Sequence, residues 1–357
     1  MKSSLFDYQL PKDLIARYPA ERRTHSRLLV VDRVSGSLQH DQFFNIGRYL
    51  KKGDLLVIND SRVLPARLMG KRSPSGGKVE VLLIREIKPL SWLVMVKPGK
   101  KIDVGDLIIF EPKLLEGKII KYCGPGERVI EFTSQGPWND LIRRLGHTPL
   151  PPYILKARRD DKHTDFAHVP LEESGDRDRY QTVYAQKNGS IAAPTAGLHF
   201  SKQLLSQLTS SGIEFATITL HIGPGTFKPI TSENIEEHDM HSEIYQVLPE
   251  EADKINLAIK QARRIIPVGT TAVRTLETCA DENGYIKAGA GETKLMITPN
   301  YRFKSTDALI TNFHLPRSTL IILVCAFGGI ETIMHAYRDA ITKRYRFYSY
   351  GDAMLIQ

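Results

Sequence analysis

Residues 190–223 read SIAAPTAGLHFSKQLLSQLTSSGIEFATITLHIG and contain the pattern that decides the fold. The run SIAAP predicts a strand, and the amphipathic segment SKQLLSQLTSSG predicts a helix that is closed by Gly212. The β-branched run EFATITLHIG then predicts a second strand. Strand, helix and strand together predict one βαβ unit.

The C-terminal half continues this alternation of helices and strands. Acidic residues lead and basic residues end the stretch 249–264, PEEADKINLAIKQARR, as the macrodipole of a helix favours. The further predicted elements are a strand at 264–269 (RIIPVG), a helix at 270–280 (TTAVRTLETCA), a strand at 307–313 (DALITNF) and a buried helix at 318–329 (STLIILVCAFGG). This half of the chain is therefore predicted to be α/β.

Residues 61–152 have a different pattern. Gly and Pro punctuate this segment, and short runs of alternating apolar residues lie between them, such as KVEVLLIREI, WLVMVKPG and RVIEFTS. Such spacing predicts a small antiparallel barrel or sandwich, which ends in a helix-like piece, WNDLIRRLG. Because apolar runs at 28–33 and 55–58 look like strands of another unit, the barrel is predicted to be an insertion.

Two domains are therefore expected. The α/β domain is discontinuous and comprises residues 1–60 and 153–357, and the inserted β-barrel domain comprises residues 61–152. A chain of 357 residues also exceeds the length of roughly 250 to 300 residues at which single cores stop growing.

The formal net charge is +9 and is unevenly distributed. Residues 61–152 carry 16 Lys and Arg against 9 Asp and Glu, whereas the rest of the chain carries 33 against 31. A basic module beside a nearly neutral one is typical of a nucleic-acid-binding domain attached to a catalytic body. A solvated basic surface is the alternative.

The cysteines predict neither disulfides nor a CxxC site, and the apolar runs predict no membrane span. Cys123, Cys279 and Cys325 are odd in number and far apart, so they predict no disulfide framework and no CxxC site. The segment MKSSLFDYQLPKDL lacks the apolar region of a signal peptide, and the longest apolar run, 320–330, is shorter than the roughly 20 residues of a membrane span. We expect a cytoplasmic protein.

The stretch 156–179 is highly charged, with 13 charged residues among 24. Too few apolar side chains occur there to offset the entropy lost on ordering. The composition therefore predicts a mobile loop.

Four predicted strands end in turns rich in glycine, small hydroxyl residues and histidine. The turns are PTAGLHF at 194–200, LHIGPGTF at 220–227, VGTTAVRTLE at 268–277 and TNFHLPRST at 311–319. In open α/β sheets, ligands bind where such strand ends meet. The four turns therefore predict one polar pocket, in which glycines let the backbone approach a ligand closely.

Three of these turns contain a histidine. His199, His221 and His314 are candidates for an acid, a base or a hydrogen-bond donor near neutral pH. For each of them, a histidine that only ties down a turn is the alternative.

Arg274 and Glu277 share one face of the helix that begins at Thr270 and Thr271. One interpretation is a surface ion pair. The other is a place in the pocket, where the free N–H groups of the helix N-terminus would bind a carboxylate or a ribose.

Two further polar stretches are ambiguous. DRDRYQTVYA at 176–185 has the composition of a lid over a substrate, and equally that of an ordinary charged loop. HDMHSE at 238–243 has an HxxH spacing beside Asp239 and Glu243, but no third ligand motif lies near it, so we expect a hydrogen-bonded turn and no metal.

Several catalytic signatures are absent from the sequence. GKRSPSGGKV lacks the spacing of a phosphate-binding loop, no strand is followed by GxGxxG, and neither HExxH nor GxSxG occurs. These absences argue against an NTPase and against a Rossmann-type nucleotide or methyltransferase site.

The same segments resemble a known family. NDSRVLPARL, RYQTVYA, AAPTAGLHF, LHIGPGTFKP, HDMHSE, VGTTAVRTLE, DALITNFHLPRSTL and YRFYSYGDAMLI are similar to the S-adenosylmethionine:tRNA ribosyltransferase-isomerases of queuosine biosynthesis, in the family's order and from Leu5 to Ile356. One departure is ITPNYRF at 297–303, where the family has a glycine after the proline. Asn300 tolerates left-handed backbone, so we expect the turn to survive.

The resemblance implies an α/β fold with a barrel-like, mixed-sheet catalytic domain interrupted by a small β-barrel. It also implies an enzyme that transfers the ribosyl part of S-adenosylmethionine to the aminomethyl-deazaguanine at the wobble position of tRNA. Epoxyqueuosine in tRNA forms, and adenine and methionine are released. S-adenosylmethionine is then a co-substrate and no other cofactor is implied; we expect a monomer.

This chemistry sets what the site must contain. A sulfonium acidifies the adjacent ribose C–H, so a general base is needed to take this proton. A hydrogen-bond donor near adenine helps the adenine to leave. We assign His199 or His221 to proton abstraction and include Asp178 among the catalytic residues. The expected substrate-binding residues are Arg179, Tyr180, Thr182, Thr195, Ala196, Gly197, Gly223, Gly225, Thr226, Thr270, Thr271, Arg274, Glu277, Asn312, His314, Arg346 and Asp352.

Two other functions remain open at this stage. A non-enzymatic RNA-binding protein would explain the basic barrel but not the four strand ends, and a methyltransferase would use the same co-substrate and tRNA. For the barrel, we expect Lys71, Arg72, Lys100 and Lys101 to contribute to tRNA binding.

Overall fold

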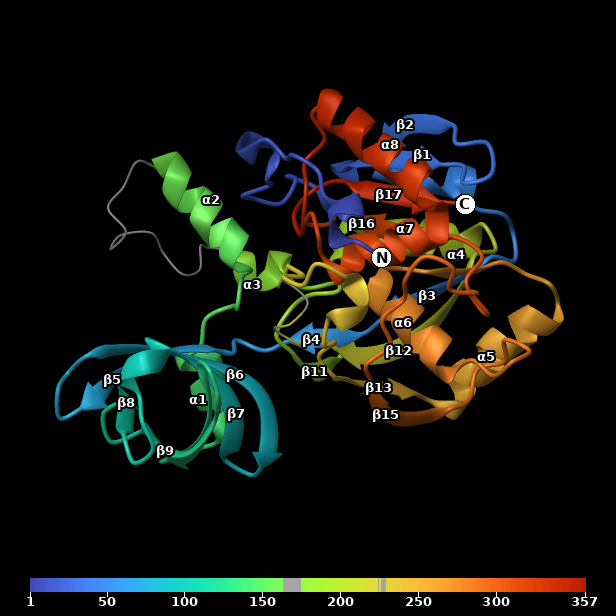
Figure 1. Cartoon of the computed structure of the whole chain (residues 1–357). Helices are drawn as coiled ribbons and strands as arrows, with labels where there is room; N and C mark the ends of the chain where they lie inside the picture. Colours follow the sequence, from blue (N-terminus) through green and yellow to red (C-terminus); the bar gives the residue numbers. More distant parts are fainter. Residues whose placement is uncertain (163–174, 224, 226–228) are drawn as a thin grey trace.

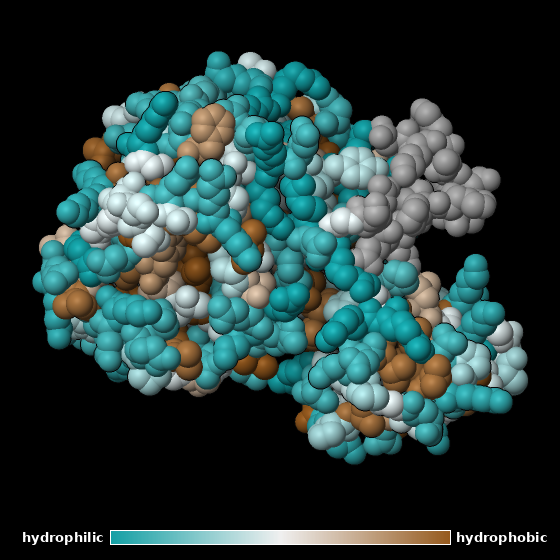
Figure 2. Space-filling view, turned by 180° about the vertical axis from the view of Figure 1, so that it is seen from behind, coloured by the Kyte–Doolittle hydropathy of each residue, from teal (hydrophilic) through white to brown (hydrophobic). Residues whose placement is uncertain are grey.

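The chain folds into an α/β body and a smaller β-barrel that projects from it (Figure 1). The structure, a computed structural model, describes residues 1–162, 175–223, 225 and 229–357. Both chain termini lie on the body (Figure 1). Seen from behind, hydrophilic residues cover most of the surface of both parts (Figure 2).

A closed antiparallel barrel forms the smaller part, in the order β10-β7-β6-β5-β8-β9. Its strands are β5 (Arg67–Ser73), β6 (Lys78–Lys88), β7 (Ser91–Lys97), β8 (Leu107–Glu111), β9 (Leu115–Gly124) and β10 (Glu127–Ser134). Alternate residues of β7 point into the barrel core, as the sequence period predicts. Helix α1 (Trp138–Leu145) follows β10 and packs its Ile142 into this core.

The described residues of the body form three sheets. Their orders are β14-β3-β12-β13-β15, β16-β17-β1-β2 and β11-β4. The strands are β1 (Arg27–Val31), β2 (Leu38–Gln42), β3 (Leu55–Asn59), β4 (Ser61–Val63), β11 (Lys187–Ser190), β12 (Glu214–His221), β13 (Glu243–Val247), β14 (Ile265–Pro267), β15 (Gly289–Thr293), β16 (Leu309–Asn312) and β17 (Ala353–Ile356).

Parallel strands form the centre of the body. Strands β14, β3 and β12 run parallel side by side, and a parallel bridge between Val268 and Ile310 joins β14 to β16 of the next sheet. Strands β13 and β15 add antiparallel edges. The predicted fold class, a mixed-sheet α/β body with an inserted antiparallel barrel, is confirmed.

Helices cover these sheets. They are α2 (Pro152–Lys162), α3 (Asp176–Arg179), α4 (Lys202–Ser210), α5 (Pro249–Lys260), α6 (Thr270–Cys279), α7 (Thr319–Gly328) and α8 (Ile330–Thr342), and a 3-10 helix, η6 (Thr195–His199), follows Pro194. The side chain of Ser201 caps α4 by accepting the N–H of Leu204 at 3.1 Å. Gly212, at φ +81°, follows the helix as the sequence predicts.

Helix α7 is apolar on all sides because it lies in the core. In the described part of the chain, no single helix has the length and apolar composition to cross a membrane. Helices α7 and α8 meet those criteria only when taken together, and the pair is bent by 115°.

Two predictions about local structure were wrong. Residues 156–162 belong to α2 and residues 176–179 form α3, where a mobile loop was expected; the remainder of that loop, 163–174, lies outside the described residues. Arg158 is fully buried there and pairs with Asp176, so charge did not mean exposure. The predicted strand SIAAP is also wrong beyond Ser190, because β11 ends there.

Two further features bear on the sequence predictions. Strand β4 pairs with β11 of the body, so Ser61–Val63 contact the body and the barrel strands begin at Arg67. Asn300 has φ +76°, the left-handed conformation expected where the family has glycine.

Candidate functional site

Three of the four predicted turns, with Ile222 of the fourth, line one small pocket at the ends of the body's strands. This strand-end pocket has a volume of about 40 Å³. Its lining is Tyr153, Ala192–Ala196, Ile222, Gly269–Thr271, Thr311–Leu315, Leu320, Tyr348 and Ser349. Since a single water needs roughly 10 to 15 Å³, the pocket by itself is too small for a nucleoside.

Local sequence explains why the turns meet there. The N–H of Gly269, at φ +95°, donates to the carbonyl of Ile310 at 2.7 Å, which holds the turn after β14 against β16. Helix α6 begins one residue later, so Thr270 and Thr271 place its unpaired N–H groups at the pocket. Asn59 donates to Thr271 Oγ1 at 3.2 Å and fixes this edge.

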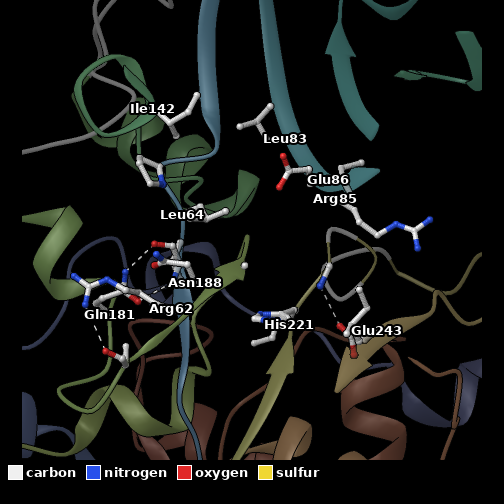
Figure 3. Close-up of a pocket in the computed structure, with 18 of the residues that line it drawn as sticks. Arg62, Leu64, Leu83, Arg85, Glu86, Ile142, Gln181, Asn188, His221 and Glu243 are labelled. Atoms are coloured by element: carbon white, nitrogen blue, oxygen red, sulfur yellow. Dashed lines mark hydrogen bonds between the residues drawn. The ribbon is translucent and has the colours of Figure 1, made fainter. Parts of the chain in front are cut away.

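A much larger space, the interdomain cleft, lies between the body and the barrel and has a volume of about 1510 Å³. Figure 3 shows His221 and Glu243 on the body facing Leu83, Arg85 and Glu86 of the barrel. The cationic residues that line the cleft are Arg23, Arg62, Arg85, Arg143, Arg177 and Lys202. Ile222 lines both the cleft and the strand-end pocket, so the two spaces adjoin.

His221 ends β12 and lines this cleft. Its ring lies on Gly189, where an added Cβ would be 2.7 Å from both Nδ1 and Cε1. Nδ1 is buried without a hydrogen-bond partner among the described residues. Burial lowers the pKa of His221, and the nearby carboxylate of Asp60 acts in the opposite direction.

His199 is in a different setting, inside the body. It is only 4% exposed, Nδ1 is 2.7 Å from Ser26 Oγ, and the ring packs against Phe43. Burial lowers the pKa of His199 to about 4, although Asp352 opposes this shift. His199 is therefore neutral at pH 7 and lines only a small cavity of about 20 Å³, together with Arg179 and Arg346.

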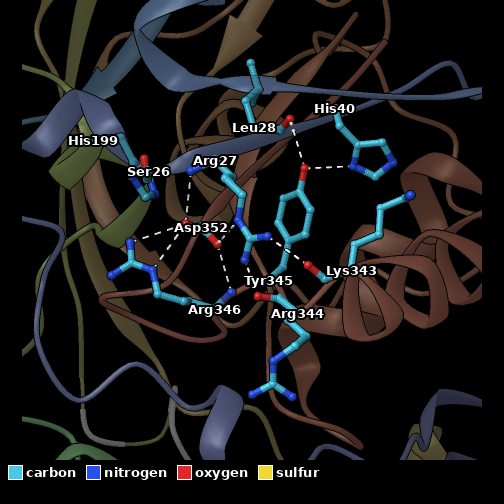
Figure 4. A network of polar contacts seen from close by, with 10 residues as sticks. All are labelled: Ser26, Arg27, Leu28, His40, His199, Lys343, Arg344, Tyr345, Arg346 and Asp352. Atoms are coloured by element: carbon cyan, nitrogen blue, oxygen red, sulfur yellow. Dashed lines mark hydrogen bonds and ion pairs between the residues drawn. The ribbon is translucent and has the colours of Figure 1, made fainter.

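Arg346 and Asp352 belong to the polar network of Figure 4. Asp352 is 1% exposed and accepts hydrogen bonds from Arg27 Nε at 3.1 Å and from the N–H of Arg346 at 2.8 Å. Arg346 Nη2 is 3.2 Å from the same carboxylate. Neither residue lines the strand-end pocket or the interdomain cleft.

His314 and Asn312 line the strand-end pocket. Nε2 of His314 lies 2.8 Å from Thr311 Oγ1, and burial lowers the pKa of this histidine to about 3. Asn312 donates to the carbonyl of Tyr348 at 3.0 Å, and its Oδ1 is buried with no partner in the described part of the chain. The three candidate histidines thus line three different spaces.

The turn after Pro194 contributes Thr195 and Ala196 to the strand-end pocket. Gly197 is packed behind them, because a Cβ there would lie 2.1 Å from the hydroxyl of Tyr184. Only glycine leaves this turn its present path.

Arg274 and Glu277 are both buried and do not pair with each other, so the surface ion pair is wrong. Arg274 pairs with Glu243 and donates from Nε to the carbonyl of Leu295 at 2.9 Å. Glu277 accepts from the N–H of Lys304 at 2.9 Å and orders the following loop. Both lie outside the residues that line the pocket and the cleft, and their predicted contacts with substrate stay predictions.

Residues 178–182, which follow the undescribed segment, have different surroundings. Asp178 and Thr182 line the cleft. Arg179 donates to the carbonyls of Glu21 at 3.1 Å and Ala20 at 2.5 Å. Tyr180 is fully buried in the core and lines none of these spaces.

The turn after β12 lies at the cleft. Gly223 lines it and donates its N–H to Glu243 Oε1 at 3.2 Å. A Cβ at Gly225 would lie 2.4 Å from the His241 ring, and Thr226 is outside the described residues. The HDMHSE turn supplies His241 and Glu243 to the cleft, and the described residues contain no group of three potential metal ligands.

Sequence reasoning missed several residues at these spaces. Asp60 follows β3 directly, next to the cleft, and Asn59 precedes it; Asn188 lines the cleft. Tyr153 lines the strand-end pocket from α2. The motif NDS after the apolar run 55–58 has the same strand-end character as the four turns, and this signal could have identified Asp60.

A pocket at the strand ends of an α/β body, next to a cleft shared with a β-barrel, is the arrangement of an enzyme. A family model described as a queuosine biosynthesis protein matches residues 3–356. The chain therefore belongs to the queuosine biosynthesis protein family, as its motifs suggested.

Relatives agree with this assignment over their full length. The chain is 51% identical to the S-adenosylmethionine:tRNA ribosyltransferase-isomerase of Symbiobacterium thermophilum and 50% identical to that of Caldanaerobacter subterraneus, with 100% of each chain covered. The crystal structure of S-adenosylmethionine tRNA ribosyltransferase from Thermotoga maritima is 37% identical, covers 99% of this chain and 100% of its own, and gives a TM-score of 0.55.

Proposed function

We propose that this protein transfers and isomerises the ribosyl part of S-adenosylmethionine onto the aminomethyl-deazaguanine at the wobble position of tRNA. The products are epoxyqueuosine in tRNA, adenine and methionine. The observation that carries the proposal is the junction of the strand-end pocket with the interdomain cleft at Ile222, beside His221. A small-molecule site that opens into a much larger cleft, lined by six cationic and five acidic residues, has room for a nucleoside and an RNA strand together.

The reaction needs a base that reaches the ribose. The C–H beside the sulfonium is the acidic position, so a neutral imidazole can take its proton. Methionine leaves later as a neutral thioether. His221 fits this role better than His199, because it lines the cleft while His199 is 4% exposed inside the body. Burial lowers the pKa of His221, which favours the neutral imidazole that a base needs.

Neutral groups surround the pocket where the nucleobase would bind. His314 has its pKa lowered to about 3, and the hydroxyls of Thr270, Thr271 and Thr311 are uncharged. A neutral, desolvated setting also favours the uncharged form of the attacking tRNA amine. Asp178, Arg179, Arg274 and Glu277 are proposed to position adenine, ribose and the methionine end.

Adenine release tests this function directly. S-adenosylmethionine labelled in the adenine, the ribose or the methyl group is incubated with the protein and tRNA that carries aminomethyl-deazaguanine. We expect adenine release that depends on the modified tRNA, label from ribose in the RNA, and methyl label only in methionine. Methyl label in the RNA would identify a methyltransferase, and tRNA binding without any adenine release would identify a non-catalytic RNA-binding protein.

A further inference from the structure

Asp60 is a buried carboxylate near the cleft. Among the residues that the structure describes, no Lys or Arg forms an ion pair with Asp60, which is 5% exposed. Two other buried acids of the body do have such partners, since Asp54 pairs with Arg264 at 2.5 Å and Asp176 with Arg158 at 2.6 Å, whereas Glu277 is held by backbone N–H and hydroxyl donors. A buried carboxylate without an ion pair is costly, and its presence points to a role other than stability.

The strand register places Asp60 beside His221. Asn59 is paired with Ile218 on the parallel strand β12, and the N–H of Asp60 donates to the carbonyl of Ile218 at 3.0 Å. Asp60 is therefore opposite Thr219, and His221 lies two residues further along β12, on the same face of the strand as Thr219.

Both side chains are held in place. Thr219 Oγ1 donates to Asp60 Oδ1 at 2.7 Å and orients the carboxylate. On the other side, Gly189 of β11 supports the imidazole ring, and a Cβ at this position would overlap it. Because Nδ1 is buried against Gly189, Nε2 is the nitrogen left to face the cleft.

We propose that Asp60 is a positioning residue for the base: its carboxylate, held by Thr219, stabilises the charge that His221 acquires when Nε2 takes a proton. This inference rests on the proposed function. In that reaction the proton leaves the ribose carbon beside the sulfonium, the electron pair of the C–H bond stays on that carbon, and the imidazole becomes imidazolium.

The electrostatic couplings agree with this arrangement. Burial raises the pKa of Asp60, while Thr219, Lys187 and His221 act to lower it. Lys187 of β11 is thus a second charged group near Asp60, and Glu243 of β13 lies near the end of β12, where Arg274 and the N–H of Gly223 engage its carboxylate. Asp60 is therefore the carboxylate whose charge acts on His221.

Asp60→Asn tests the proposal, with Asp54→Asn as the matched control at the opposite end of β3. Two quantities are measured in each variant: the pKa of His221, from its ring signals in NMR titrations, and the pH dependence of single-turnover adenine release. We expect Asp60→Asn to lower the pKa of His221, to move the acidic limb of the rate profile to lower pH by a similar amount, and to slow the reaction at least about tenfold.

The control sharpens the result. Asp54→Asn should reduce stability but leave both the His221 titration and the acidic limb unchanged. An unchanged His221 titration in Asp60→Asn would overturn the proposal, whatever its rate. If no variant or parent released adenine, the proposed function would fail, while the NMR titration would still decide whether Asp60 acts on His221.

Discussion

At the residue scale, burial gives three similar histidines different chemistry. His221 is half-buried at the cleft, whereas His199 and His314 are enclosed, with pKa values lowered to about 4 and about 3. A base must reach its proton, so accessibility selects His221. The sequence placed all three at strand ends but could not rank them, because burial depends on elements far away in the chain, such as Ser26 and Phe43 beside His199.

A pair of variants checks this ranking. His221→Gln should lower the single-turnover rate of adenine release by about 10² to 10⁴-fold, the usual contribution of a general base. His199→Gln should lower stability, since the hydrogen bond between the imidazole and Ser26 is removed, but change the rate of the folded enzyme less than about tenfold. Equal rate reductions in the two variants, measured with saturating ligands, would remove the basis for choosing His221.

Stability should depend on pH through the buried histidines. Their folded pKa values lie below the unfolded value of about 6.5, so the unfolded state binds more protons, and stability present above pH 6.5 is lost as the pH falls toward 4. Each histidine contributes a slope of about 1.4 kcal/mol per pH unit within this window. Urea unfolding of His314→Gln between pH 4.5 and 6 should therefore give a slope lower by about this amount; an unchanged slope would contradict the burial of His314.

At the element scale, the sequence predicted the regular elements well and the charged segment badly. The repeat of apolar residues along β12, α4 and α6 identifies these elements, because this repeat can be read within each segment alone. Helices α2 and α3 contain buried charges, and only the tertiary pairing of Arg158 with Asp176 makes such residues suitable for the interior. No local sequence pattern predicts an ion-pair partner that lies 18 residues away.

This ion pair gives a prediction for the two helices. Arg158→Met leaves the carboxylate of Asp176 buried without its guanidinium, which should destabilise the protein by about 3 to 5 kcal/mol. Arg48→Met removes an exposed guanidinium that pairs with Asp41 at 3.7 Å, and because Asn45 and Tyr49 still donate to that carboxylate, the change should cost less than about 1 kcal/mol. Denaturant unfolding measures both, and adding Asp176→Asn to Arg158→Met should recover part of the stability. Equal effects of the two single variants would refute a structural role for the buried pair.

At the scale of the whole molecule, the sequence predicted the parts but not their relative position. The insertion of a barrel and the convergence of strand ends follow from patterning, since each depends on periods and turns along the chain. The interdomain cleft does not follow, because its two walls come from the barrel at Leu83 and Trp92 and from the body at His221 and Gly189. No pattern in either segment specifies the other wall.

The position of the cleft also decides which cations should contact RNA. Lys71, Lys100 and Lys101 are exposed on the barrel but do not line the cleft, and Arg72 is engaged by Asp106 at 2.8 Å. Arg62 and Arg143 are exposed and line it. If the tRNA lies in the cleft, Arg62 and Arg143 should account for more of the salt dependence of tRNA binding than the barrel lysines.

Charge reversal separates the two groups. In Arg62→Glu with Arg143→Glu, we expect weaker tRNA binding and a salt slope of log K that is shallower by about 0.7 to 0.9 for each phosphate that the protein no longer neutralises. In Lys100→Glu with Lys101→Glu, an equal change of net charge away from the cleft, the long-range attraction falls, but the slope should change less. Binding is measured from 50 to 300 mM salt, about the range in which counterion release dominates. If the lysine variant flattened the slope more than the arginine variant, the RNA would run along the outer side of the barrel, and the cleft would be left to the nucleoside.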